Sequence, residues 1–166
     1  MSQEDGTDTR TVNVSYNPQG YLETVTGPLN HTVSYHYDGA GRVTQQTLPD
    51  SRLIHYDYDP NGNLTSLTPP GRSAHVFSYT PVNLTEQYTP PAAGLATPQT
   101  HYAYNRDRQL THITRPDSQT VRLQYNATTG RLEALTTPTA TSSYAYNAVG
   151  QLARITVPEG GLELQL

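Results

Sequence analysis

The chain has 166 residues, a formal net charge of −4, 34% hydrophobic and 14% charged residues, and no cysteine. The missing cysteine excludes disulfides, thiolate nucleophiles and cysteine-ligated zinc, and a negative charge without any basic stripe argues against nucleic-acid binding. So polar a composition would suit a disordered chain, but 13 regularly placed tyrosines indicate an ordered protein with a thin core.

The first segment in chain order is a polar extension over residues 1–11. It has no apolar run of the kind that an ordinary secretory signal requires. No apolar stretch of the sequence approaches the ~20 residues that a membrane-spanning helix needs. We therefore expect no ordinary signal peptide and no membrane span, and export through a dedicated system if the protein is secreted.

A repeated unit fills residues 12–160. Each unit is anchored by a tyrosine that recurs every 21 residues, with one longer interval of 25 residues between Tyr79 and Tyr104. The seven anchor tyrosines are Tyr16, Tyr37, Tyr58, Tyr79, Tyr104, Tyr125 and Tyr146. A constant interval of this length is typical of stacked copies of one small structural unit.

Each unit begins with a predicted strand that ends at its anchor tyrosine. Two residues before the anchor stand apolar or aromatic side chains, namely Val14, Tyr35, Tyr56, Phe77, Tyr102, Leu123 and Tyr144. The positions between them are mostly polar, as at His36 and Asp57. Alternation of this kind, rich in β-branched and aromatic residues, predicts a strand with one buried face.

A turn is predicted directly after each anchor. Asp or Asn opens it in most units, as at Asp38 and Asp59, and a glycine three residues later closes four of them: Gly20, Gly41, Gly62 and Gly150. This pattern suits a type I turn closed by a left-handed residue. The fifth unit has Arg108 in place of the glycine and the sixth reaches its glycine late, at Gly130, so we expect these two hairpins to be less regular.

The second predicted strand carries apolar residues three positions apart, such as Leu22 and Val25. This spacing breaks strict alternation and predicts a β-bulge. Thr and Pro close each unit, and turn-forming residues lead into the next strand. We expect the 25-residue interval to expand one such connection, around Pro90-Pro91-Ala92-Ala93-Gly94.

The predicted fold is therefore all-β, an antiparallel array of seven stacked β-hairpins. Residues 161–166 alternate apolar and polar side chains and form either a C-terminal strand or the start of a further repeat. Because the chain has no Lys to blunt its open sheet edges, we expect it to associate with a second copy. The residues assigned structural roles are Tyr16, Tyr35, Tyr37, Asp38, Gly41, Tyr56, Tyr58, Asp59, Gly62, Tyr79, Tyr102, Tyr104, Tyr125, Tyr144, Tyr146 and Gly150.

The repeat pattern Y-x-Y-D-x-x-G-R-L-x-x-[ILV]-T-x-P resembles the YD repeat of the Rhs family. The resemblance covers about Val12 to Gly160 and is clearest over residues 35–43 and 56–64. The family includes bacterial polymorphic toxins, shell-forming subunits of insecticidal toxin complexes, wall-associated proteins and animal teneurins. The resemblance implies that this chain is a segment of a spiralling, hollow β-shell that encloses a toxic domain. In such a shell the repeats are the scaffold. Seven repeats are too few to close such a shell.

The resemblance does not extend to the family's aspartyl autoproteolytic core. The tetrapeptide Asp59-Pro60-Asn61-Gly62 is similar to one element of that core, but it occupies an ordinary repeat turn. Asp57 and Asp59 could serve as an acid–base pair, yet Asp59 already has a turn-capping role. His55 and His101 share one repeat position but lie two units apart, too far to bind one metal ion. We therefore predict no catalytic, metal or cofactor site.

The tyrosines leave an alternative function open. Rows of aromatic rings can stack on sugars, so a surface adhesin that binds glycans is the competing hypothesis to a toxin shell. Most tyrosines coincide with the apolar face, where they supply packing volume. Tyr21 and Tyr88 are predicted to be exposed and off this row, which makes them the candidate ligand contacts.

Overall fold

The computed structural model describes residues 10–91, 98–157 and 164–165. The chain divides between His75 and Val76 into two compact units, which are considered separately. All the regular structure of the described residues is β-strand, and no described segment forms a helix that could span a membrane. The predicted all-β fold is confirmed.

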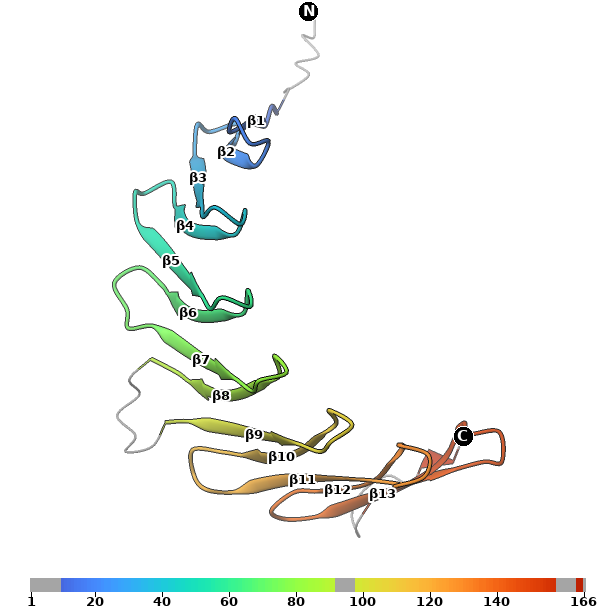
Figure 1. Cartoon of the computed structure of the whole chain (residues 1–166). Helices are drawn as coiled ribbons and strands as arrows, with labels where there is room; N and C mark the ends of the chain where they lie inside the picture. The colour runs from blue at the N-terminus through green and yellow to red at the C-terminus, as the bar shows by residue number, and fades with distance from the viewer. Residues whose placement is uncertain (1–9, 92–97, 158–163, 166) are drawn as a thin grey trace, which may run out of the picture. The chain divides into compact units, whose positions relative to one another are not determined.

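The first unit contains three hairpins built from six strands, which lie in chain order in an antiparallel sheet (Figure 1). Their bounds are β1 (Asn13–Tyr16), β2 (Leu22–Thr26), β3 (Thr32–Tyr37), β4 (Val43–Thr47), β5 (Leu53–Tyr58) and β6 (Leu64–Thr68). The first strand of every hairpin ends at its anchor tyrosine.

The second unit repeats this arrangement with four more hairpins, followed by one short strand. The bounds are β7 (His75–Tyr79), β8 (Thr85–Thr89), β9 (Thr100–Tyr104), β10 (Leu110–Thr114), β11 (Thr120–Tyr125), β12 (Leu132–Thr136), β13 (Thr141–Tyr146), β14 (Leu152–Thr156) and β15 (Leu164–Gln165). Neighbours in the chain are again antiparallel partners in the sheet.

The second strand of each of the seven hairpins contains one extra residue. In the first hairpin, Tyr16 pairs with Leu22 and Ser15 with Thr24, so Glu23 has no counterpart. The same register shift precedes every anchor tyrosine. The bulge predicted from the three-residue spacing is confirmed, and it returns Leu22 and Val25 to one face of the sheet.

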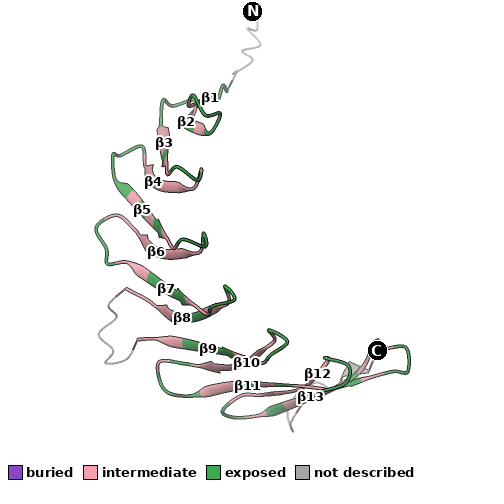
Figure 2. Cartoon of the chain, viewed as in Figure 1, coloured by how far each residue is buried: buried purple, intermediate pink, exposed green. Residues whose placement is uncertain are grey.

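The mainly apolar face is a row of cross-strand neighbours within each unit, with Gln46 in the first unit and Thr100 and Ser142 in the second as polar members. Val14 pairs with Val25, which pairs with Val33 on the next hairpin. Each sheet is a single layer, so no described residue is fully buried (Figure 2), and the row residues of the internal strands are half-buried. Stability in such a layer depends on cross-strand pairs and on contacts between neighbouring hairpins.

The turns follow the predicted chemistry with one exception. Gly20, Gly41, Gly62 and Gly150 have positive φ angles, as does Gly130 in a turn that is one residue longer. The fifth hairpin was expected to be irregular, and this prediction is wrong. Arg108 takes a φ of 62°, and its amide donates to the Asn105 carbonyl as the glycine amides do elsewhere. The turn hydrogen bonds offset the moderate cost of a left-handed arginine.

The long interval lies between hairpins, as predicted. β8 ends at Thr89 and β9 begins at Thr100, whereas β4 and β5 are separated only by residues 48–52. Tyr88 and Thr100 are paired, and they hold the same repeat positions as the paired residues Val25 and Val33. The extra residues of the connection therefore do not change the register between β8 and β9. Residues 92–97 of this connection lie outside the described residues.

Candidate functional site

The most regular polar contact among the described residues joins a hairpin to the one before it at five junctions. The hydroxyl of an anchor tyrosine donates to the carbonyl oxygen of the first residue in the preceding hairpin's second strand. This contact, named here the hydroxyl bridge, links Tyr37 to Leu22 (2.6 Å), Tyr58 to Val43 (2.9 Å), Tyr104 to Thr85 (2.8 Å), Tyr125 to Leu110 (2.9 Å) and Tyr146 to Leu132 (3.0 Å).

The bulge explains why these carbonyls accept a side chain. Between hairpins, β2 and β3 pair only from Thr24↔Ser34 to Thr26↔Thr32, so Leu22 lies beyond the end of their ladder. A backbone carbonyl without a ladder partner must bond elsewhere or to water. The Tyr37 hydroxyl supplies that bond, and a hydrogen bond of this kind contributes about 1 kcal/mol net.

The ring of the anchor tyrosine is covered by a second repeated contact. At three junctions the residue that follows the turn, named here the cover residue, lies on the anchor ring of the next hairpin. Tyr21 stacks on Tyr37 with ring centroids 5.0 Å apart. The guanidinium of Arg42 lies 4.7 Å from the ring centroid of Tyr58, and that of Arg131 lies 5.6 Å from the Tyr146 centroid. Both stacking and cation–π contacts of this geometry are stabilising.

Arg42 also joins two successive turns. Its Nε and Nη2 both contact Oδ2 of Asp38 at 2.7 Å, and its Nη1 donates to the Asp59 carbonyl at 3.1 Å. The backbone amide and the side chain of Arg42 both donate to Asp38, which lowers the pKa of that carboxyl group. Burial raises the pKa of the Tyr58 hydroxyl, so the phenol that forms the bridge is held neutral.

The cover residues also explain the need for two of the turn glycines. A Cβ on Gly41 would lie 2.5 Å from the hydroxyl oxygen of Tyr21, and the guanidinium of Arg131 occupies the place of a Cβ on Gly150. Both glycines also have positive φ angles, of 79° and 84°. Glycine is therefore required there for backbone conformation and for close approach of the preceding hairpin.

The Asp and Asn residues that open the turns act as caps. Oδ1 of Asn17 accepts from the amides of Gln19 and Tyr21, and Oδ1 of Asp38 accepts from Ala40 and Arg42. Asp59 binds Asn63 through both carboxylate oxygens, and the hydrogen bond from the Asn63 side chain is the main cause of its lowered pKa. Its carboxylate is thus used in the turn, as the sequence predicts.

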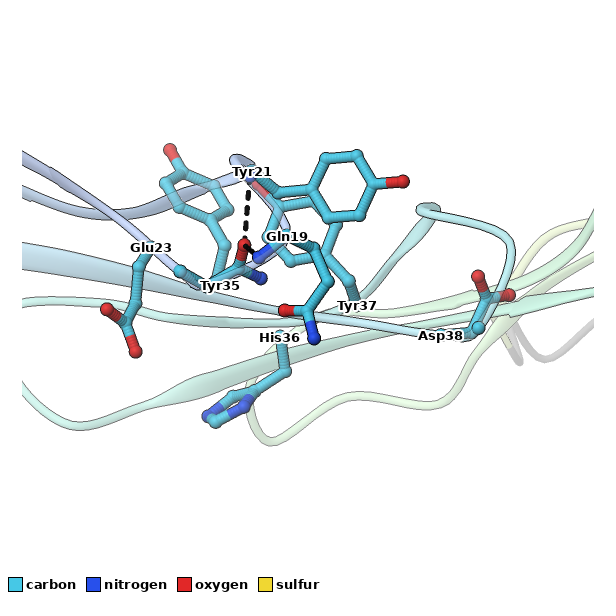
Figure 3. A pocket seen from close by; sticks show the side chains of 9 residues that line it. Gln19, Tyr21, Glu23, Tyr35, His36, Tyr37 and Asp38 are labelled. Carbon is cyan, nitrogen blue, oxygen red and sulfur yellow. Dashed lines mark hydrogen bonds between the residues drawn. The ribbon is translucent and has the colours of Figure 1, made fainter.

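Where neighbouring hairpins diverge beyond the bulge, an open groove forms beside the bridges of Tyr37, Tyr104 and Tyr125. The groove between the first two hairpins has a volume of about 500 Å³ and is lined in part by Tyr21, Glu23, His36 and Tyr37. Figure 3 shows the Tyr21 and Tyr35 rings on one side of the ribbon and the Glu23 and His36 side chains on the other. A groove with equivalent lining residues lies between the fourth and fifth hairpins. It therefore belongs to the repeat architecture.

The candidate ligand contacts fall into different environments. Tyr21 lies off the apolar row and is 40% exposed, but its ring is stacked on Tyr37 as a cover residue. Tyr88 was expected to lie off the row, and this is wrong: it pairs with Phe77 inside the row, stacks on that ring at 5.2 Å and is half-buried. Ligand binding by either tyrosine stays a prediction.

The residues considered for chemistry do not converge in the described part of the chain. His55 and His101 are exposed on separate strands, and Asp57 lies opposite Ser66. Among the described residues, no group of three His, Asp or Glu side chains could hold a metal ion. The repeated contacts of this molecule thus connect one hairpin to the next.

Comparison with known proteins gives the same architecture. A family model described as the teneurin YD-shell matches residues 2–166. No curated protein matches. Among solved structures, the TcdB2-TccC3-Cdc42 complex is 17% identical with a TM-score of 0.66 over 85% of this chain. The Photorhabdus luminescens Tc holotoxin pore carrying the TccC3-D651A mutation is 14% identical with a TM-score of 0.58 over 92% of this chain.

These similarities cover a small part of the larger proteins. The chain spans 9% of the matched chain in the first structure and 10% in the second. At such low identity the solved structures establish the shared fold and nothing further. The family match covers nearly the whole chain and is consistent with the repeat pattern.

Proposed function

This chain belongs to the teneurin YD-shell family, and on that premise we propose that it is a wall segment of a β-shell that encloses or delivers a toxin. The family is a structural shell family, and one of the solved structures that share this fold is a Tc holotoxin pore. In this role the repeats carry no catalytic residue. The partners would be further YD repeats and an enclosed cargo, and the protein would be exported by a dedicated system.

The hydroxyl bridge is the observation that carries this proposal. A wall must hold a single-layered sheet together without a core, because one face borders a lumen and the other borders solvent. Each bridge satisfies a carbonyl at the divergent end of two hairpins, where the ladder has stopped. The cover residues add a contact at the same place. The repeated tyrosines therefore serve wall integrity.

The competing adhesin hypothesis is less well supported. Sugar recognition by stacking needs ring faces that are open to the ligand. Tyr37, Tyr58 and Tyr146 each have a face against a cover residue, and their hydroxyls are bonded to the backbone. A glycan array separates the hypotheses, since reproducible binding that is lost in Tyr21→Ala would favour the adhesin.

Protease protection tests the shell directly. The natural protein that carries this chain is treated with a broad-specificity protease, and the survival of its non-repeat portion is followed by mass spectrometry. We expect protection under native conditions and rapid digestion once mild denaturant opens the wall. The Tyr58→Ala variant should lose protection at lower denaturant concentration than Tyr58→Phe. Equally fast digestion with and without denaturant would refute enclosure.

A further inference from the structure

The turn between β9 and β10, in the fifth hairpin, differs from the other six hairpin turns at two positions. Arg106 and Arg108 stand two and four residues after the anchor Tyr104, where the other units have Pro, Gly or Ala and then Gly, Asn or Thr. Of the five described non-glycine residues with a positive φ, Arg108 is the one that carries a charge. Strained backbone conformations cluster at ligand sites, so this turn is a candidate for one.

The two guanidinium groups of this turn are not used in the fold. Arg42, Arg52 and Arg115 each have a carboxylate partner. Arg106 and Arg108 are exposed, and their side chains have no hydrogen-bond, ion-pair or aromatic partner among the described residues. A guanidinium presents five N–H donors in a fixed plane, an arrangement that matches a carboxylate. Both groups are thus available to an anionic ligand.

Both arginines line the groove between the fourth and fifth hairpins, which has a volume of about 510 Å³. Val82, Leu84 and Tyr102 supply apolar surface to the same groove, and Val82 is 47% exposed. Glu86 is the one carboxylate in the lining, since Asp107 stands between the arginines in the chain but does not line the groove. The groove therefore combines apolar surface with two guanidinium groups against one carboxylate.

The equivalent groove between the first two hairpins has the opposite charge. Its lining contains the carboxylates of Glu23 and Asp38 and no arginine (Figure 3). Gly41 stands there at the repeat position of Arg108. Because the two grooves share the same repeat architecture, the positive charge comes from the residues that replace the usual turn residues in the fifth hairpin.

We propose that the groove between the fourth and fifth hairpins binds an acidic polypeptide segment. Carboxylates of the segment pair with Arg106 and Arg108, and apolar side chains beside them contact Val82 and Leu84. A peptide fits this groove better than a sugar does, because its two tyrosines are half-buried and its exposed apolar residue is aliphatic. The inference does not rest on the toxin-shell role, since any partner with such a segment satisfies it.

Fluorescence anisotropy of a labelled synthetic peptide of alternating Glu and Leu, titrated with the full chain, tests the proposal. We expect saturable binding that weakens as salt is added. Arg108→Gly should lower the affinity several-fold without lowering the urea midpoint of unfolding, because glycine adopts a positive φ without strain. A purely structural role for Arg108 would instead lower the urea midpoint.

Three further variants locate the site. Arg106→Ala should also lower the affinity several-fold, and Glu86→Gln should raise it by removing the one carboxylate from the lining. Arg72→Ala is the matched control, because Arg72 is likewise exposed and without a described side-chain partner but lies outside the groove. Its affinity for the peptide should be unchanged.

Two further probes test the chemical class of the ligand. A peptide of alternating Gln and Leu should bind several-fold more weakly than the acidic peptide, and oligogalacturonate, an acidic sugar, should not compete with it. The proposal would be overturned by equal binding of the Gln peptide, by competition from oligogalacturonate, or by an equal loss of affinity in Arg72→Ala and Arg106→Ala. An unchanged affinity or a lowered urea midpoint in Arg108→Gly would overturn it as well.

Discussion

The first and third hairpins have the same local structure and different surroundings. Both have a capped turn, a left-handed glycine and a bulge in the second strand. Tyr16, however, is 62% exposed, whereas Tyr58 is half-buried, donates to Val43 and lies under Arg42. The internal structure of a hairpin is therefore the same whether or not a described hairpin precedes it. The preceding hairpin adds burial and the contacts to the anchor tyrosine.

The largest expected difference in stability between the two hairpins comes from truncating the anchor tyrosine, Tyr58 in the third hairpin and Tyr16 in the first. Tyr58→Ala loses ring packing, the cation–π contact and the hydroxyl bridge, so we expect a loss of about 2–3 kcal/mol in the free energy of unfolding. Tyr16→Ala loses little and should stay within about 0.5 kcal/mol. Urea titration followed by circular dichroism measures both. Equal losses would mean that contacts between hairpins are not the main source of stability.

Removing only the hydroxyl isolates the bridge. Tyr58→Phe keeps the ring and leaves the Val43 carbonyl without its donor, which should destabilise the chain by about 1 kcal/mol. Tyr16→Phe is the matched control, since it has no described bridge to lose. The bridge would be energetically unimportant if both variants unfolded at the same urea concentration.

The turn glycines offer a third comparison. Gly20→Ala and Gly41→Ala both place a side chain at positive φ, at a cost of about 1–2 kcal/mol. Gly41→Ala should cost about 1 kcal/mol more, because Tyr21 must move and lose its stacking on Tyr37. In the background of Tyr21→Ala this excess should disappear. If Gly41→Ala still cost more than Gly20→Ala in that background, the difference would come from the turn backbone and not from contact with Tyr21.

High pH should weaken the third hairpin. Burial raises the pKa of Tyr58 above its usual 10.0, so the neutral phenol favours the folded state. This contribution is complete below pH 10.0 and is lost as the pH rises through the raised pKa of the folded chain. Unfolding free energies measured across this range should fall less steeply for Tyr58→Phe than for the unmodified chain.

The smallest effect is expected at acid pH, in the turns. Hydrogen bonds from Arg42 lower the pKa of Asp38 below 3.8, so the stability contributed by its carboxylate is complete above pH 3.8 and lost as the pH falls through the lowered value. Asn17 fills the same position in the first hairpin and does not titrate. Asp38→Asn should therefore keep the cap and remove this part of the acid dependence, measured as the shift of the acid-unfolding midpoint.

The sequence predicts the hairpins well because their determinants are local. The alternation before each anchor, the Asp or Asn at the turn and the three-residue spacing after it predict strand, turn and bulge from neighbouring residues. Arg108 shows the limit of this approach. Its left-handed conformation depends on hydrogen bonds that close the turn around Asn105, and residue preference alone favours glycine there.

The contacts between hairpins were not predicted, because they depend on where two strands separate. No sequence pattern shows that the Leu22 carbonyl lies beyond its ladder, so the acceptor for Tyr37 is found only in the structure. The role of Tyr21 as a cover residue could have been predicted from the sequence. Tyr21 aligns with Arg42 at the residue after the turn, and both side chains can cover an aromatic ring. The two residues differ in type, so the pattern is recognised only by comparing what the side chains can contact.

Each hydroxyl bridge joins a hairpin to the one directly before it in the chain. Duplication or deletion of one complete repeat in the gene would therefore recreate the same bridge at the new junction, with no new contact required. Smaller changes in length are tolerated in the connections, as between β8 and β9, where Tyr104 still reaches Thr85. A change in length by one complete hairpin would thus preserve the hydrogen bond between neighbouring hairpins, so the structure sets one hairpin as the natural increment of length.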